Sequence, residues 1–288
     1  MRFEFFTMGG SQLWEDVFFY QKWRIQRNYR TKEYRLLDPW DIQRQSGGFE
    51  NCRRAFLDYI EIYEISRQRG HMVIMLHGLG DSKNIFKPLW RAVLKEGMMA
   101  AAINYPSTRK RIDSHVRQLE FLLNHLEDVQ EVSFVTKGVG GIVLRKLMAL
   151  ESPWQKKLKI RRIVQVCPPN QGSRLFAKLE KYSFFRWLLG PILKEVSPNN
   201  MIFIPNFPKG TEFGIIATDF PGKNLTNMLS ESLKKSLPTP GESDLEGAKE
   251  VIHVSNVNYN VFNNDKVVKA CVKFLTCLLY TSPSPRDS

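Results

Sequence analysis

Short apolar runs alternate with amphipathic stretches along the chain from residue 70 onward. The runs at 72–76, 98–104 and 131–136 have the length and apolar character of strands that are buried on both faces. Between them, 113–126 repeats its apolar residues at helical spacing. Such alternation is typical of a parallel sheet, because each crossover helix covers one face of the sheet. The sequence therefore predicts an α/β fold with a mostly parallel central sheet and helices on both faces.

The same patterns place the remaining elements. Further strands are expected at 160–167, 213–217 and 251–254, and helices at 140–150, 174–196 and 265–275. A hairpin within 23–37 and a helix at 49–66 precede the sheet. We expect an N-terminal extension over 1–69, and one domain over 70–276 that includes a helical, cap-like segment at about 174–208.

The end of the chain does not continue this pattern. Residues 277–288, CLLYTSPSPRDS, resemble the translation of a sequencing-library adapter, so they are set aside in considering the fold. The remaining 276 residues keep three of the four cysteines and the full net charge of +13, because Arg286 and Asp287 cancel.

The charge balance narrows the classes of function. Lys and Arg number 42 against 29 Asp and Glu, but the basic residues are scattered and accompany no RNA-binding, zinc-finger or helix-turn-helix pattern. We therefore expect a solvated basic surface and no nucleic-acid partner. No apolar stretch approaches about 18 residues and no signal peptide is visible, so a cytoplasmic protein without a membrane span is expected. The cysteines form no close pair, and the sequence predicts neither a metal nor a cofactor.

Glycines follow two of the expected strands. Leu76-His77-Gly78-Leu79-Gly80 comes directly after one, and Thr136-Lys137-Gly138-Val139-Gly140-Gly141 joins another to a helix. With Tyr105-Pro106-Ser107, Pro168-Pro169-Asn170-Gln171-Gly172-Ser173 and the segment 23–39, they resemble landmarks of the α/β-hydrolase superfamily, in its bacterial lipase and serine-esterase-like branch. The resemblance covers roughly residues 10–275 and implies the α/β-hydrolase fold.

The resemblance also implies an oxyanion hole, which is a pair of backbone amides that bind a carbonyl oxygen. One half would be the turn at His77 and Gly78, with the amide of Leu79 as donor. The other half would be the start of the helix, at Val139 and Gly140. His77 is expected to shape its turn rather than to act in catalysis.

The nucleophile position departs from the family. Members place a serine on a tight strand-to-helix turn, commonly in the pattern Thr-His-Ser-x-Gly-Gly. Here Gly138 occupies that position, and glycine has no side chain that could attack a carbonyl. Lys137 is expected to line, fill or cap the pocket. A replacement nucleophile at Lys137 or Thr136 is the less favoured alternative.

The histidine position departs as well. The resemblance places the catalytic histidine in a loop after the last strand, where this chain has Tyr259. Tyrosine, with a pKa near 10, is a poor general base at neutral pH. His253 is expected within the last strand instead. For the catalytic acid, Asp244 is the best candidate.

These departures favour a degenerate catalytic triad. The first hypothesis is a binding or regulatory pseudoenzyme that takes an acyl or ester small molecule or a protein partner through an inherited pocket. The alternative is an active serine esterase or lipase-like hydrolase, through non-standard residues or a sequence error. A weaker alternative is a basic membrane-surface binder that uses the aromatic residues of 175–193.

Overall fold

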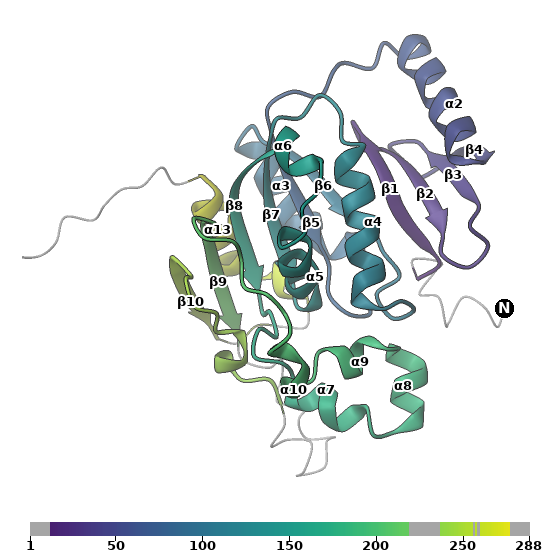
Figure 1. Cartoon of the computed structure of the whole chain (residues 1–288). Helices are drawn as coiled ribbons and strands as arrows, with labels where there is room; N and C mark the ends of the chain where they lie inside the picture. The colour runs from purple at the N-terminus through teal and green to yellow at the C-terminus, as the bar shows by residue number, and fades with distance from the viewer. Residues whose placement is uncertain (1–11, 219–236, 256, 258–259, 277–288) are drawn as a thin grey trace, which may run out of the picture.

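The computed structural model describes residues 12–218, 237–255, 257 and 260–276. Within these ranges the chain forms a four-stranded sheet near the N-terminus and a six-stranded sheet further along (Figure 1).

The first sheet is antiparallel, with its strands in chain order. The strands are β1 (Trp14–Tyr20), β2 (Trp23–Asn28), β3 (Tyr34–Leu37) and β4 (Gln43–Gly47). Helix α2 (Phe49–Ile62) covers it, because Phe56 packs among the rings of Phe18, Tyr20 and Trp23. The expected hairpin is β2 with β3, and β1 and β4 extend it. The expected helix at 49–66 ends earlier, at Ile62.

The second sheet is parallel throughout, in the order β10-β9-β8-β7-β5-β6. Its strands are β5 (His71–Leu76), β6 (Met99–Ile103), β7 (Glu131–Lys137), β8 (Lys159–Val166), β9 (Phe213–Thr218) and β10 (Glu250–Val254). Successive residues of a strand point to opposite faces. Thus Ile74 and Leu76 belong to one core cluster, and Val73 and Met75 to the other.

Helices cover both faces of this sheet. The first cluster includes residues of α4 (Ile112–Asn124), α5 (Val139–Met148) and α6 (Trp154–Lys157). The second includes residues of α3 (Lys87–Lys95) and α13 (Asp265–Thr276). Burial on both faces explains why the strands read as continuous apolar runs.

These observations confirm the predicted fold class. The parallel sheet, the helices on both faces and the turn from β7 directly into α5 form an α/β-hydrolase fold. The first sheet and α2 lie within the predicted extension, residues 1–69. Among the helices of the described ranges, none is long and apolar enough to cross a membrane.

The segment after β8 is helical but broken. The prediction of one helix over 174–196 is wrong, since the chain forms α7 (Arg174–Leu179), α8 (Ser183–Leu189), α9 (Ile192–Glu195) and α10 (Pro198–Met201). Gly190 has a φ of 76°, which a helix does not allow, and Pro191 lacks a backbone N–H. The chain turns there to pass Thr108, whose carbonyl oxygen lies 2.0 Å from where a Cβ of residue 190 would be.

Helix α5 passes close to the end of β5 at Gly140. A Cβ on Gly140 would lie 2.7 Å from the carbonyl oxygen of Leu76 and 2.9 Å from that of His77. Backbone atoms cannot swing aside as a flexible side chain can, so any larger residue has to push α5 away from β5.

We therefore expect Gly140→Ala to lower the free energy of unfolding by about 1–3 kcal/mol, the usual effect of overpacking. Gly241→Ala is the matched control, because its new Cβ would have Asp244 Oδ2 at an ordinary 3.7 Å. Urea unfolding of both variants measures the difference. Equal stability of the two would contradict the close approach of α5 to β5.

Candidate functional site

Gly138 forms the turn between β7 and α5. Its φ of 51° and ψ of −125° lie in a region that residues with a side chain rarely adopt. This is the strained strand-to-helix turn on which hydrolases of this fold present their nucleophile. Gly138 therefore has the backbone geometry of such a turn, and it carries no side chain.

The two predicted halves of the oxyanion hole lie at one cavity. Leu79 and Val139 both line it, together with Gly78 and Gly138. The turns face each other, since a Cβ on Gly138 would lie 3.8 Å from Gly78 Cα. Val139 is the first residue of α5, so its N–H has no acceptor within the helix.

The cavity has a volume of about 230 Å³ and a largely apolar wall. Its apolar residues come from the two turns, from the segment after β8, from α7 and from the region before α13. Those outside the turns are Pro168, Pro169, Leu175, Phe176, Pro238 and Val261. The polar side chains are Asp81, Lys137, Cys167, Ser173, Thr218, Thr239, Glu242 and Ser243. A mostly apolar wall with a few polar groups is typical of a small-molecule site.

Lys137 and Asp81 form an ion pair within this cavity. The Lys137 Nζ atom lies 2.8 Å from Asp81 Oδ2, and the two side chains are 11% and 5% exposed. Lys137 thus lines the cavity, as the sequence predicted, but its charge is held by a partner that sequence reasoning missed. Only a neutral amine can act as a lysine nucleophile, and an ion pair with a carboxylate does not favour that form.

His77 lies beneath the cavity, fully buried, and shapes the turn that carries Gly78. Its Nδ1–H donates to the Gly78 carbonyl oxygen at 2.9 Å, and its Nε2 accepts from the backbone N–H of Tyr105 at 3.4 Å. The two rings stack with centroids 4.1 Å apart. Burial lowers the pKa of His77, which keeps the imidazole neutral and suits these two bonds.

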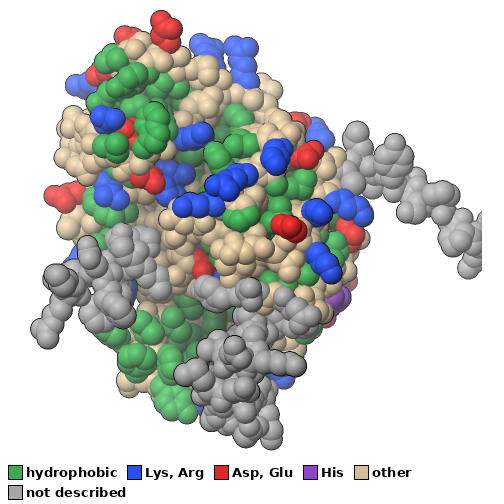
Figure 2. Space-filling view, turned by 180° about the vertical axis from the view of Figure 1, so that it is seen from behind, with side chains coloured by type: hydrophobic (Ala, Val, Ile, Leu, Met, Phe, Trp, Pro, Cys, Tyr) green, Lys and Arg blue, Asp and Glu red, His purple; other side chains and the backbone are tan. Residues whose placement is uncertain are grey.

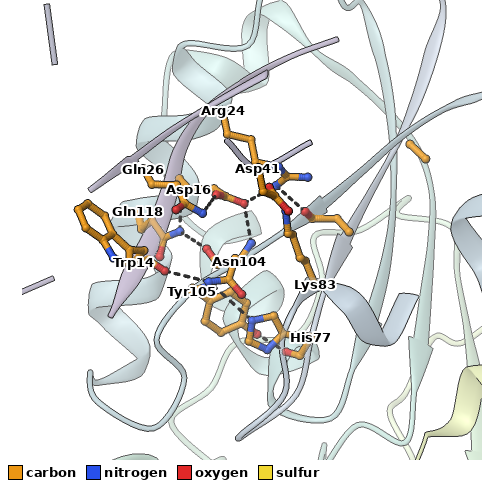
Figure 3. Close-up of polar contacts among 12 residues, drawn as sticks. Trp14, Asp16, Arg24, Gln26, Asp41, His77, Lys83, Asn104, Tyr105 and Gln118 are labelled. Atoms are coloured by element: carbon orange, nitrogen blue, oxygen red, sulfur yellow. Dashed lines mark hydrogen bonds and ion pairs between the residues drawn. The ribbon is translucent and has the colours of Figure 1, made fainter. Parts of the chain in front are cut away.

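Side chains of the N-terminal sheet hold the loop at Asn104 and Tyr105, which packs against His77 (Figure 3). Asp16 of β1 accepts hydrogen bonds from Arg24 Nη1 at 2.6 Å, Gln26 Nε2 at 2.8 Å and the backbone N–H of Asn104 at 2.7 Å. Asn104 directly precedes Tyr105 in the chain. The extension therefore braces the loop against which His77 packs.

Gln12 also links the N-terminal segment to the loops that contain Asp81 and Thr108. Its Nε2 donates to the Asp81 carbonyl oxygen at 3.0 Å, and its Oε1 accepts from the backbone N–H of Thr108 at 3.0 Å. Ser107 Oγ accepts from the Gly80 N–H at 3.0 Å. No motif in the sequence pointed to these contacts, because they join residues 27 to 96 positions apart.

The remaining predicted residues lie elsewhere. Asp244 is exposed and is absent from the cavity wall as far as the structure describes it, whereas Glu242 and Ser243 line it. Gly140 packs behind the cavity, against β5. His253 is exposed on β10. Tyr259 lies outside the described residues.

Besides Asp81, two further titratable residues of the wall were not predicted as site residues. Burial raises the pKa of Glu242, whose Oε1 accepts from Arg174 Nε at 3.1 Å. Burial also raises the pKa of Cys167, whose Sγ lies 3.0 Å from Thr218 Oγ1. A raised pKa disfavours the thiolate, which is the nucleophilic form of cysteine.

The cap-like segment exposes aromatic side chains beside the cavity-lining helix α7. Tyr182, Phe184 and Trp187 are 59%, 61% and 53% exposed. A lipid-facing role for this segment stays a prediction.

Comparison with known proteins gives matches among solved structures alone. No family model and no curated protein sequence matches the chain. A protein from Listeria innocua is 12% identical with a TM-score of 0.48, over 75% of this chain and 97% of that one. A methylesterase from Arabidopsis is 12% identical with a TM-score of 0.45, over 71% and 98%. A monoacylglycerol lipase from Paleococcus ferrophilus is 12% identical with a TM-score of 0.45, over 71% and 93%.

One buried histidine near the site, His115, makes the stability of the fold depend on pH. His115 of α4 is buried with its ring centroid 4.9 Å from that of Tyr105. Burial, with the nearby charge of Lys110, lowers the pKa of His115 from 6.5 to about 3. Between these values the unfolded chain binds a proton that the folded chain does not, so stability falls as the pH falls from 6.5 toward 3.

We expect His115→Phe to remove this share of the pH dependence. Relative to wild type, the variant should lose about 2 kcal/mol less stability between pH 7 and pH 5, since each pH unit below 6.5 is worth about 1.4 kcal/mol. Urea unfolding at both pH values measures the change, with exposed His253→Gln as control. If His115→Phe leaves the difference in unfolding free energy between pH 7 and pH 5 unchanged, His115 takes up its proton in the folded state and the prediction is wrong.

Proposed function

We propose that this protein binds an acyl or ester small molecule in the cavity at Gly138 and does not hydrolyse it. The observation that carries this proposal is Gly138 itself. Its φ of 51° keeps the nucleophile turn and the cavity in front of it, yet the position has no side chain to attack a carbonyl. Glycine adopts this conformation readily, and without a side chain it leaves the cavity in front of the turn open.

The cavity offers complementary groups to such a ligand. The carbonyl oxygen would accept hydrogen bonds from the backbone N–H groups of Leu79 and Val139. The acyl chain would lie along Leu175, Phe176 and Val261, which supply apolar surface. The space that a serine side chain would fill at residue 138 is left to the ligand.

Hydrolysis needs an activated nucleophile and a general base. The described wall of the cavity has hydroxyl groups on Ser173, Thr218, Thr239 and Ser243 but no histidine to activate them. Its carboxylates, Asp81 and Glu242, are paired with Lys137 and Arg174. Burial keeps Cys167 toward the thiol form. Binding without turnover is therefore the activity that the geometry supports best.

Methyl hexanoate tests this proposal by nuclear magnetic resonance. We expect saturation transfer from the full-length protein to the ester, and no release of methanol above the rate in buffer. Leu175→Trp should abolish the transfer, because the indole fills the cavity. Leu57→Trp is the matched control, since Leu57 is exposed on α2, and it should bind as wild type does.

Two results would overturn the proposal. Methanol release that Leu175→Trp removes would make the protein an ester hydrolase. Absence of saturation transfer in wild type, or equal transfer in both tryptophan variants, would show that acyl esters do not bind in this cavity.

A further inference from the structure

A second cavity lies where the N-terminal sheet meets the α/β domain. It has a volume of about 260 Å³. Its wall comes from β1, β2, the loop after β3, the segment before α3, α3 itself and β6. Figure 2 views the molecule from the side of α3, where Lys and Arg side chains gather near the middle of the face.

The described wall of this cavity is strongly basic. Lys22, Arg24, Lys83 and Lys87 line it, against the single carboxylate of Asp41. Arg24 is paired with the buried carboxylate of Asp16, so the three lysines against Asp41 leave a local net charge of +2. Like charges repel, so such a wall costs free energy unless an anion neutralises it.

Three of these cations contact other groups of the fold. Arg24, buried in β2, donates through Nη1 to Asp16 Oδ2 at 2.6 Å and to the Ala102 carbonyl oxygen at 2.9 Å. Lys83 is 19% exposed and pairs with Asp41 (Figure 3). Lys22 Nζ lies 5.0 Å from the centre of the Trp90 ring, a cation–π distance.

The cations also act on one another. Burial, followed by the charge of Arg24, lowers the pKa of Lys83. The charge of buried Asp16 opposes this effect, and so does the Asp41 carboxylate, which is 50% exposed and therefore screened by solvent. A bound anion would be less screened than Asp41 and would stabilise the charged form of Lys83.

We infer that this cavity binds a small phosphate ester. Its phosphoryl group would lie among the ammonium groups of Lys22, Lys83 and Lys87, which bind phosphate as point charges. Its organic part would lie against Trp90. The volume, below the usual range of about 300–1,000 Å³, favours a compact ligand.

This site is separate from the cavity at Gly138. Among the residues that the structure describes, the two walls have none in common. Binding of a phosphate ester can therefore succeed or fail independently of acyl binding.

Phenyl phosphate is the probe, measured by isothermal titration calorimetry with the full-length protein at constant ionic strength. We expect saturable binding in wild type and at least a tenfold loss of affinity in Lys83→Met. Lys22→Met should weaken binding as well, and it changes an exposed turn residue, so its folding is not in question. Lys159→Met is the control of equal charge change, because Lys159 is 67% exposed on β8, and it should bind as wild type does.

Absence of saturable heat in wild type would overturn the inference, and so would equal affinity in all three variants. Vesicles of phosphatidylcholine with and without phosphatidic acid distinguish the source of the phosphate group. Sedimentation with phosphatidic acid that Lys83→Met and Lys22→Met reduce would assign the site to a lipid headgroup. Phenyl phosphate binding without such sedimentation would assign it to a soluble phosphate ester.

Discussion

The buried carboxylate of Asp16 holds together the parts on which the candidate site depends. It is fully buried and accepts hydrogen bonds from two side chains of β2 and from the backbone at the end of β6. A buried carboxylate is tolerated only when its oxygens are satisfied in this way. Through Asn104 it fixes the loop that packs on His77, and His77 in turn fixes the turn at Gly78. The N-terminal extension is therefore part of the site's support.

The sequence predicted those features that depend on local pattern. Apolar runs identified the parallel strands, because burial on both faces removes alternation. The spacing of Gly138 and Gly140 located the strand-to-helix turn, because a positive φ and a close backbone approach both require glycine. The ion pair of Asp81 and Lys137 could not be predicted in this way. Asp81 meets Lys137 across 56 positions, and nothing near either residue indicates its partner.

The exact positions of side chains depend on contacts of the same kind. Asp244 is the acid candidate of the sequence, and the structure places it on the surface, while the short 3-10 helix at Pro240–Ser243 turns Glu242 and Ser243 to the cavity. The predicted long helix breaks at Gly190 because the chain has to pass Thr108. Both depend on tertiary contacts. The net charge of +13 had no explanation in the sequence, and the structure gathers part of it around the cavity between the N-terminal sheet and α3.

We propose that the site has the backbone of a hydrolase without its nucleophile. The intact mass of the protein after exposure to a fluorophosphonate tests this, with an active serine esterase treated in parallel. We expect an unchanged mass, because Gly138 offers no hydroxyl and Lys137 is held by Asp81. A phosphonylated adduct on any residue of the cavity wall would contradict it and identify the protein as an active hydrolase.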